Sequence, residues 1–173
     1  MLQKHSLRLP FTLILLLTMT GCSLKPYTVT FNDNVISSPN AALLNSIVSD
    51  PSLQACLNQN LSNLGTTDAT RIKLLACPGA GIKSLDGINA LASLEQLELS
   101  DNSIDNLSPL SSLRNLRVLG LRNNGIRNIG PLTSLPLLRF VSLQDNDNIL
   151  CRQLDELGAK LGNTLNRPLG CVK

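Results

Sequence analysis

Five cysteines carry most of the chemistry that this 173-residue sequence could perform. A thiolate can attack an electrophile or hold a metal ion, and two thiols can join in a disulfide. Cys22 lies alone near the start of the chain, and the other four are Cys56, Cys77, Cys151 and Cys171. Their chemistry therefore depends on the compartment that the chain reaches and on how the fold brings these four together.

The first 21 residues predict export. Lys4, His5 and Arg8 form a basic start, and an apolar run follows over 11–19. A charged start, about 7–15 apolar residues and small residues before a cleavage point are typical of a secretory signal peptide. The run is shorter than the roughly 20 residues that a helix needs to cross a bilayer. We expect residues 1–21 to be removed.

The segment Met19-Thr20-Gly21-Cys22 resembles the bacterial lipobox, with Met19 where that motif usually has Leu. The resemblance implies that the sulfur of Cys22 is lipidated, that the chain is cut before it, and that the new N-terminus is acylated. Several acyl chains anchor firmly, whereas one chain binds a membrane only marginally. Ser23 follows Cys22, and in enteric-type bacteria a residue other than Asp at this position resembles an outer-membrane sorting signal. The alternative is an ordinary signal peptide cut nearby, with Cys22 as an extra cysteine.

The other four cysteines predict disulfides, because an even count is typical of exported proteins with oxidised pairs. Four cysteines permit three pairings, and their placement favours Cys56–Cys77 and Cys151–Cys171. A loop of this length, once closed, contributes about 3 kcal/mol in the chain-entropy model. Four thiolates could instead bind zinc, but the sequence has no C-x-x-C and the pairs are far apart along the chain. We expect disulfides, no metal and no cofactor.

Catalysis has little support from the remaining residue types. Removal of the leader removes His5, the only histidine, which excludes Ser-His-Asp and Cys-His machinery from the mature chain. The carboxylate pairs Asp101/Asp105 and Asp155/Glu156 fit solvated surface charges better than a general acid and base. We therefore expect a protein that is not an enzyme.

Phosphate, calcium and nucleic acid are also poor candidates as ligands. The glycine cluster at 79–81 lacks a following Lys-Ser/Thr. The segment 145–147 lacks the spaced oxygen series and the closing Glu of a calcium loop. Loss of Lys4 and Arg8 leaves 13 of the 15 basic residues against 12 acidic ones, a net charge of +1. Nucleic-acid binding normally needs a concentrated basic face, so we expect none.

A period of 22 residues organises the centre of the chain. Asn102, Asn124 and Asn146 stand one step apart, and apolar residues recur in the same phase. A period of 20–29 residues carrying L-x-x-L-x-L-x-x-N predicts a leucine-rich-repeat solenoid. The recurring apolar positions are Leu97, Leu119 and Val141; Leu99, Leu121 and Leu143; Ile104 and Ile126; Leu107 and Ile129; Leu110 and Leu132; Leu113 and Leu135; and, one step earlier, Ile72, Leu75, Cys77, Ile82, Leu85, Ile88 and Leu91.

The run L-x-L-x-x-N-x-I-x-x-[IL]-x-x-L resembles the internalin type of leucine-rich repeat. The resemblance implies a short α/β solenoid over 71–148, in which each L-x-L is a strand of a curved parallel sheet. Pro109 and Pro131 favour short 3₁₀ or helical turns on the convex side. The asparagines are expected to bind loop backbone groups. Ala80 in place of Asn and Asn148 in place of Ile indicate atypical first and last repeats.

A cap at each end must cover the apolar cross-section of the solenoid. Ser38-Pro39 and Asp50-Pro51 predict two helix starts, giving helices over about 39–48 and 51–64 in a cap over 38–70. Residues 22–37 are expected to be the lipidated tether, in which a short strand is allowed. The inward residues should be Leu43, Leu44, Ile47 and Val48 in the first helix, and Leu53, Cys56, Leu57, Leu61 and Leu64 in the second.

A second cap is predicted over 149–173. Leucines at steps of three or four predict an amphipathic helix over about 151–165, after which the chain returns to Cys171. The leucines of this stripe are Leu150, Leu154, Leu157, Leu161 and Leu165.

The outward residues of the strands form the candidate binding site, because side chains alternate between the two faces of a strand. Val118 beside Phe140 predicts an exposed apolar patch near arginines, which resembles an interface hot spot. Small residues such as Gly120 should leave room for a partner. Isolated exposed apolar residues are also normal, and Phe140 could partly cover the cap. The site is predicted to comprise Gln96, Glu98, Arg117, Val118, Arg122, Arg139, Phe140 and Gln144.

The internalin resemblance implies recognition of a protein on the concave face. We therefore expect a monomeric, lipid-anchored module that binds an unidentified protein and lies in the bacterial cell envelope, at the outer membrane. The alternative is a structural or assembly accessory lipoprotein of the envelope.

Overall fold

The computed structural model describes the backbone of residues 29–31 and 34–37 and all atoms of residues 47–173. The leader, Cys22 and most of the helix expected over 39–48 lie outside these residues. β1 (Val29–Phe31) pairs antiparallel with β2 (Asn34–Ser37), so the predicted tether contains a two-stranded hairpin. Residues 47–49 are bends, which makes the prediction of a helix reaching Val48 wrong, although Val48 is buried as expected.

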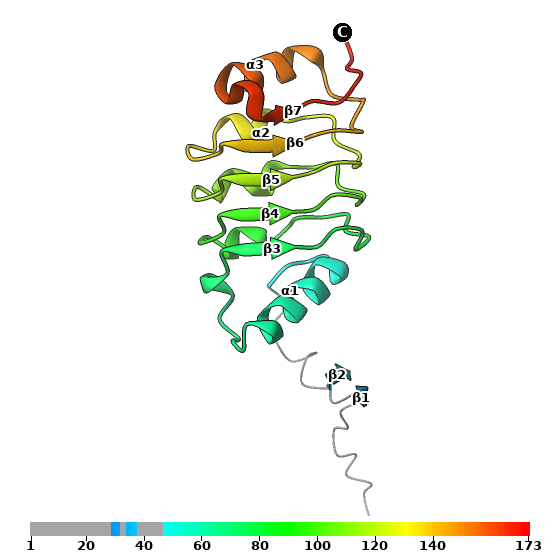
Figure 1. The fold of residues 1–173 in the computed structure, drawn as a ribbon, viewed down its shortest axis with the longest axis vertical. Coiled ribbons are helices and arrows are strands. Elements are labelled where there is room, and N and C mark those ends of the chain that lie inside the picture. The colour runs from blue at the N-terminus through cyan, green and yellow to red at the C-terminus, as the bar shows by residue number, and fades with distance from the viewer. Residues whose placement is uncertain (1–28, 32–33, 38–46) are drawn as a thin grey trace, which may run out of the picture.

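Five short strands stack in parallel in the order of the chain (Figure 1). Leu75, Leu97, Leu119 and Val141 are direct partners across the first four strands, which confirms the 22-residue register of the sheet. Their side chains are at most 1% exposed. The strands are β3 (Leu74–Ala76), β4 (Gln96–Glu98), β5 (Val118–Gly120), β6 (Phe140–Ser142) and β7 (Leu165–Asn166).

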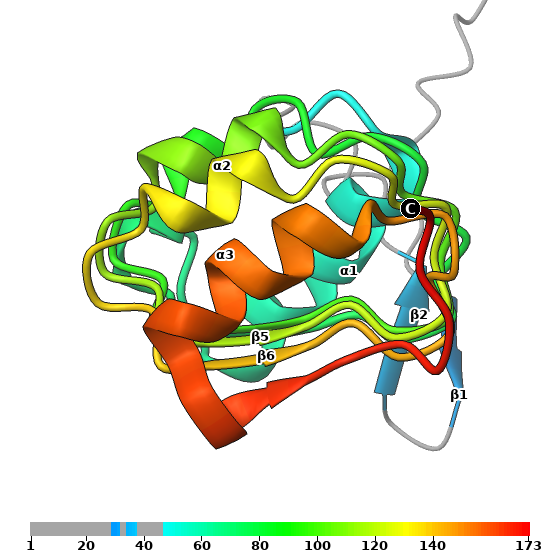
Figure 2. The ribbon, with the colours of Figure 1, turned by 90° about the horizontal axis from the view of Figure 1, so that it is seen from above.

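Short helical turns form the side of the solenoid opposite the sheet (Figure 2). Pro109 and Pro131 each lie in the first turn of their element, where proline loses no helical hydrogen bond. The predicted convex side is confirmed. Its elements are η3 (Ile88–Ala90), η4 (Ser108–Ser112) and α2 (Gly130–Thr133), and a further turn, η2 (Ala69–Arg71), precedes β3.

Three asparagine side chains join successive loops on the side where the strands end. Asn124 is typical: its Nδ2 donates to the carbonyls of Leu99, Leu121 and Arg122, and its Oδ1 accepts from the amide of Ile104. Asn102 and Asn146 repeat this pattern one turn below and one turn above. Loop carbonyls and amides that have no partner in the sheet are thereby satisfied, as predicted.

The N-terminal cap is α1 (Pro51–Asn63), packed on the first repeat. The Asp50 Oδ1 accepts from the amides of Ser52 and Leu53, and its Oδ2 accepts from those of Lys83 and Ser84. This carboxylate therefore caps the N-terminus of α1 and also binds two backbone amides of the first repeat. The first repeat has Ala80 where the later repeats have an asparagine.

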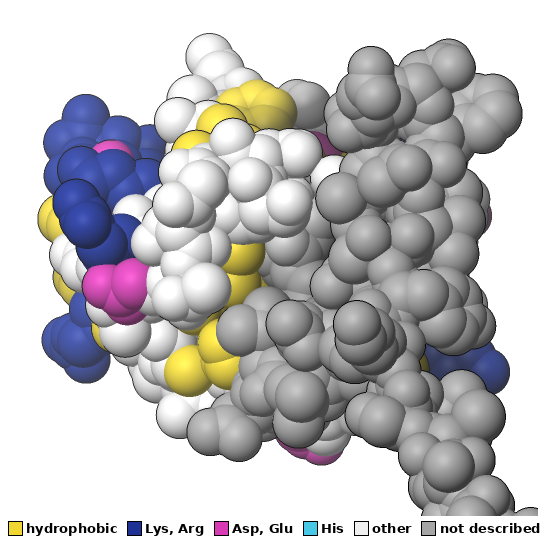
Figure 3. Space-filling model, turned by 90° about the horizontal axis from the view of Figure 1, so that it is seen from below, with side chains coloured by type: hydrophobic (Ala, Val, Ile, Leu, Met, Phe, Trp, Pro, Cys, Tyr) yellow, Lys and Arg dark blue, Asp and Glu magenta, His cyan; other side chains and the backbone are white. Residues whose placement is uncertain are grey.

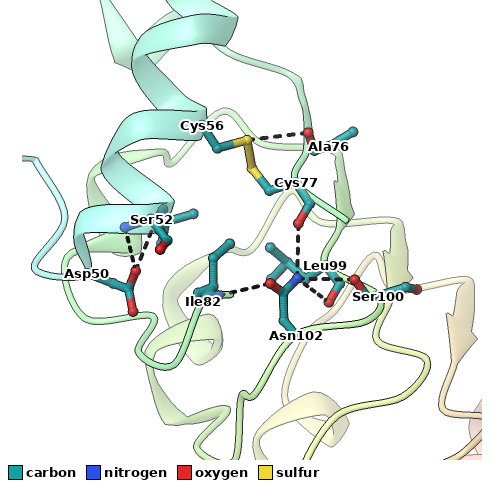
Figure 4. Close-up of a disulfide and its surroundings, with 10 residues drawn as sticks. Asp50, Ser52, Cys56, Ala76, Cys77, Ile82, Leu99, Ser100 and Asn102 are labelled. Atoms are coloured by element: carbon teal, nitrogen blue, oxygen red, sulfur yellow. Dashed lines mark hydrogen bonds between the residues drawn. A yellow bond between two sulfur atoms is a disulfide. The ribbon is translucent and has the colours of Figure 1, made fainter. Parts of the chain in front are cut away.

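A disulfide fastens the same cap to the sheet. Cys56 on α1 bonds Cys77 at the end of β3, and Cys77 also accepts from Asn102 through its carbonyl (Figure 4). The pairing favoured from the sequence is the one found. Leu64, predicted to face inward, is 60% exposed because the helix ends before it and Gly65 turns the chain away with a φ of +63°.

The C-terminal cap is shorter in helix than predicted. α3 (Cys151–Leu161) buries Leu154, Leu157 and Leu161, but a 3₁₀ turn, η5 (Gly162–Thr164), follows instead of more helix. Gly162 adopts a φ of +57°, and Leu165 then enters β7 as the partner of Val141. The prediction of helix to 165 is wrong because the open edge of β6 accepts one more strand.

The junction into this cap contains one extra residue. Asn148 is exposed, and Ile149 takes the buried position that Ile104 and Ile126 hold in the regular repeats. Leu150, predicted to be inward, is 40% exposed because it pairs with Val172 as an isolated bridge. The second disulfide joins Cys151 to Cys171, again as favoured from the sequence. No helix of the described residues has the length and apolarity to cross a membrane.

Candidate functional site

The outward residues of the sheet form columns that follow the 22-residue step. Gln96 is the direct partner of Leu74, Val118 of Gln96, and Phe140 of Val118. Parallel strands lie about 4.8 Å apart, so each column is a continuous stripe on a stiff surface. We call this surface, formed by the outward side chains of β3 to β6, the strand face.

A shallow hollow of about 160 Å³ lies in the strand face toward the N-terminal cap. Leu74 and Val118 are 51% and 37% exposed there, and because both line the same hollow they form a small apolar patch and are not isolated exposed residues. The hollow is lined by Leu74, Leu75, Ala76, Gln96, Leu97, Glu98 and Val118.

The exposed apolar surface therefore lies nearer the N-terminal cap, at Leu74 and Val118, than the patch of Val118 and Phe140 predicted from the sequence. Phe140 is only partly exposed and does not line the hollow. Leu74 and Ala76 line it but were not among the predicted site residues. Leu74 stands one 22-residue step before Gln96, and Ala76 one step before Glu98, so the period itself places both on the outward side of the sheet.

Glu98 occupies the room that Gly120 was expected to leave for a partner. A Cβ at Gly120 would lie 1.7 Å from the Glu98 Oε2, so the carboxylate of Glu98 sits directly over this glycine and buries it. The Glu98 Oε1 also accepts from the amide of Ser100 at 2.8 Å. The expectation of free space at Gly120 is therefore wrong, and the open part of the face lies at the hollow instead.

Arg122, a predicted site residue, is held between two carboxylates at the end where the strands finish. Its guanidinium donates to Asp101 and to Asp145, each at 3.1 Å. A hydrogen bond from Asn123 to Asp101, together with the charge of Arg122, lowers the pKa of the Asp101 carboxyl. Arg122 thus stiffens the loop stack, and its charge is already balanced.

The loops that carry these carboxylates repeat a left-handed backbone conformation. Gly79, Asp101, Asn123 and Asp145 follow the 22-residue step and have φ values of +63°, +60°, +51° and +60°. Glycine, asparagine and aspartate are the residues that adopt this conformation most readily. The recurrence of Gly, Asp or Asn at this position of each repeat is a sequence signal for a tight turn after each strand.

The other end of the strand face, where the strands begin, carries cations. Glu95 binds Lys73 at 3.0 Å and Arg117 at 3.7 Å. Arg139, next in that column, forms no ion pair with any residue between 47 and 173. Gln144, the last predicted site residue, is exposed at the opposite end beside Arg122, and its carbonyl accepts from the amide of Asn123.

A second, polar hollow of about 590 Å³ lies among the loops that follow the strands. Asn102 and Asn124 line it, but their amides already bond the loop backbone. The described residues contain no group of three His, Cys, Asp or Glu side chains that could hold a metal ion. The polar groups of this second hollow are thus already bonded, whereas the hollow in the strand face exposes Leu74 and Val118.

Comparison with known proteins supports the repeat assignment. A family model described as "Leucine Rich repeats (2 copies)" matches residues 114–159. A search of curated proteins found no match.

Two solved structures from Listeria monocytogenes are similar to this chain. An internalin (inlF) is 32% identical with a TM-score of 0.61, and the match covers 73% of this chain and 38% of that one. An internalin C2 (inlC2) is 27% identical with a TM-score of 0.56, and the match covers 62% of this chain and 50% of that one. This chain therefore spans half or less of the proteins that it resembles.

The two disulfides add information on location, because such bonds persist in oxidising compartments outside the bacterial cytoplasm. The register of the sheet, the asparagine ladder and the similarity to the two internalins agree with one another. The repeats from β3 to β6 are therefore a leucine-rich-repeat solenoid of the bacterial internalin type.

Proposed function

We propose that this chain is a non-catalytic, lipid-anchored module of a bacterial envelope that captures a protein partner on its strand face. The observation that carries the proposal is the hollow in that face, with Leu74 and Val118 exposed at its rim. Apolar side chains in a depression close to arginines are typical of the residues that dominate protein interfaces.

The rigidity of the face supports the same proposal. Each strand from β3 to β6 is bonded to the next, and the asparagine ladder joins the loops that follow the strands. A surface that is already ordered loses little conformational entropy on binding, so more of the contact energy appears as affinity. The two disulfides close both ends of this scaffold.

The proposed anchor is the lipid on Cys22, which lies outside the described residues. Export is consistent with the disulfides, and the lipobox resemblance supplies the attachment point. Mass spectrometry of the N-terminal peptide tests this part on its own. Acyl groups on Cys22 would support it, whereas an unmodified cysteine within a longer N-terminal segment would contradict it.

Site-specific photo-crosslinking tests the binding face in living cells. A photo-reactive phenylalanine analogue replaces Gln96, which lines the hollow, or Ser111, which is exposed on the opposite side in η4. We expect a discrete crosslinked protein from position 96 and not from position 111. Equal crosslinking from both positions, or none from position 96, would contradict the proposed function.

A further inference from the structure

Positive charge is concentrated along one edge of the sheet. We call this edge the basic margin, and it contains the exposed or partly exposed cations at or shortly before the start of the strands. Figure 3 shows Lys and Arg side chains gathered on the side from which the strands start in Figure 1. The members of the basic margin are Arg71, Lys73, Arg114, Arg117 and Arg139.

Acidic side chains balance only part of this charge. Lys73 and Arg117 share the single carboxylate of Glu95. Arg114 and Arg139 are exposed and form no ion pair within residues 47–173. Arg71 also forms no ion pair within these residues, but its charge acts on the Asp68 carboxyl. Arg114 and Arg139 can therefore meet an incoming anion without breaking a described contact.

The opposite edge of the same sheet has a different charge balance. There Arg122 is held between Asp101 and Asp145, and further carboxylates lie nearby at Asp105 and Asp147. The basic margin is therefore not a general property of a basic protein. It is a local excess on a mature chain whose predicted net charge is close to zero.

The basic margin adjoins the hollow directly. Lys73 precedes Leu74 in the chain, and Arg117 precedes Val118, so each apolar residue at the rim of the hollow has a cation as its neighbour. Successive residues at the start of a strand are about 3.3 Å apart along the chain. A partner side chain in the hollow would thus bring its own neighbours over the basic margin.

We propose that the strand face recognises an acidic protein segment, in which an apolar side chain enters the hollow and adjacent Asp or Glu side chains pair with the basic margin. This inference rests on the proposed function and names the chemistry of its partner. The carboxylates would meet Arg114 and Arg139 first, because these two arginines are not already paired.

The distribution of exposed apolar residues favours a protein segment over an anionic membrane. Insertion into a bilayer would need large apolar side chains among the cations of the margin. The large apolar residues that are exposed in 47–173 are Leu64, Leu74, Val118, Leu150, Leu169 and Val172, and none of them belongs to the margin. Only Leu74 and Val118 lie beside the margin, at the rim of the hollow, and two apolar side chains on a sheet provide little area for insertion into a bilayer.

Peptide display against the full chain, produced in bacteria and immobilised, tests the inference. Random peptides are selected on the wild type at low salt and then washed at rising salt. We expect enriched peptides to carry Asp or Glu beside an apolar residue. We also expect the double variant Arg114→Glu/Arg139→Glu to capture these peptides about tenfold less in the binding step, since steering by surface charge changes association rates by roughly this factor or more.

A matched control separates local from overall charge. Arg127→Glu/Arg152→Glu makes the same change in net charge away from the margin, and we expect it to retain the acidic peptides like the wild type. If both double variants lose the peptides equally, the basic margin has no special role and the inference fails.

A second variant separates this inference from the proposed function. Leu74→Ser/Val118→Ser alters only the rim of the hollow. If enriched peptides depend on these two residues but are neutral or basic, the acidic partner is wrong while the binding face stands. If no peptide depends on them, both proposals fail.

Binding to lipid vesicles tests the alternative that the partner is a membrane. Sedimentation is measured with vesicles of phosphatidylcholine alone and with an added fraction of phosphatidylglycerol. We expect the soluble, leader-free form of the full mature chain to bind neither. Binding to the anionic vesicles that Arg114→Glu/Arg139→Glu removes would overturn the proposal in favour of a lipid surface.

Discussion

The inward and outward side chains of each strand are under different packing constraints, and two adjacent residues of β5 show the difference. Leu119 faces the core with 0% exposure and has leucine or valine above and below it. Val118 faces outward and has Gln96 and Phe140 as its neighbours. The inner side repeats because every turn must fill the same cross-section, whereas the outer side varies because packing does not restrict it. Information about a partner can therefore be carried only on the outer side.

The largest effect that would test this contrast is truncation of a core leucine. Leu119→Ala should lower the free energy of unfolding by about 2–5 kcal/mol, because it removes packed atoms and leaves a cavity between two neighbouring turns. Val118→Ala, one residue earlier, should change it by less than about 1 kcal/mol. Urea denaturation followed by circular dichroism measures both. Similar losses from the two variants would show that the outer side is also part of the packing.

The second effect concerns the asparagine ladder. Asn124→Ala should cost about 1–3 kcal/mol, since it leaves the part-buried Ile104 amide without a partner. It also removes one of the two hydrogen bonds that each of the Leu99, Leu121 and Arg122 carbonyls accepts. Asn115→Ala is the matched control, because Asn115 is exposed, has no left-handed φ and bonds only the Ala92 carbonyl among the described contacts. Denaturation of the two variants under one condition provides the comparison. Equal stability of both would mean that solvent satisfies these loops as well as Asn124 does.

The regular part of the molecule was predictable from sequence for the same physical reason. The 22-residue step predicted the strand register, the buried columns and the role of the asparagines, because each turn contacts only its neighbours and faces the same requirements. The cysteine pairing followed from their position at the two ends of the array. These predictions needed local pattern alone.

The predictions that failed depended on contacts that the pattern does not contain. Leucine spacing favoured helix as far as Leu165, but Leu165 instead pairs with Val141 at the open edge of β6. The expected space at Gly120 was lost to the carboxylate of Glu98, whose side-chain direction depends on the amide of Ser100. Irregular ends and outward side chains are set by tertiary contacts, which is why the candidate site was less predictable than the core.

The third effect is smaller and depends on pH. Burial would raise the pKa of Asp50, but bonds from the amides of Lys83, Ser84, Leu53 and Ser52 outweigh burial and lower it. A lowered pKa in the folded state gives stability that is present above the unfolded value near 4 and is lost as the pH falls through the folded value.

Asp50→Asn should therefore destabilise the protein by about 1 kcal/mol at neutral pH. Its one oxygen can still cap α1, but its NH2 group cannot accept from the Lys83 and Ser84 amides as the second carboxylate oxygen does. The difference from the wild type should shrink below pH 4, where the wild-type carboxyl also becomes protonated. Thermal unfolding between pH 2 and pH 7 measures this difference. A gap that stays constant across the range would show that the charge of Asp50 is not what joins α1 to the first repeat.

The smallest effect on stability should come from the outer side itself, at Gly120. A methyl group there would displace the carboxylate of Glu98, which is the mobile end of a flexible side chain, and the glycine does not need a positive φ. Gly120→Ala should therefore leave the free energy of unfolding within about 0.5 kcal/mol of the wild type. Because Glu98 lines the hollow, the same change should alter crosslinking from position 96. A stability change without a binding change would assign Glu98 and Gly120 to the scaffold, and the reverse would assign them to the partner's site.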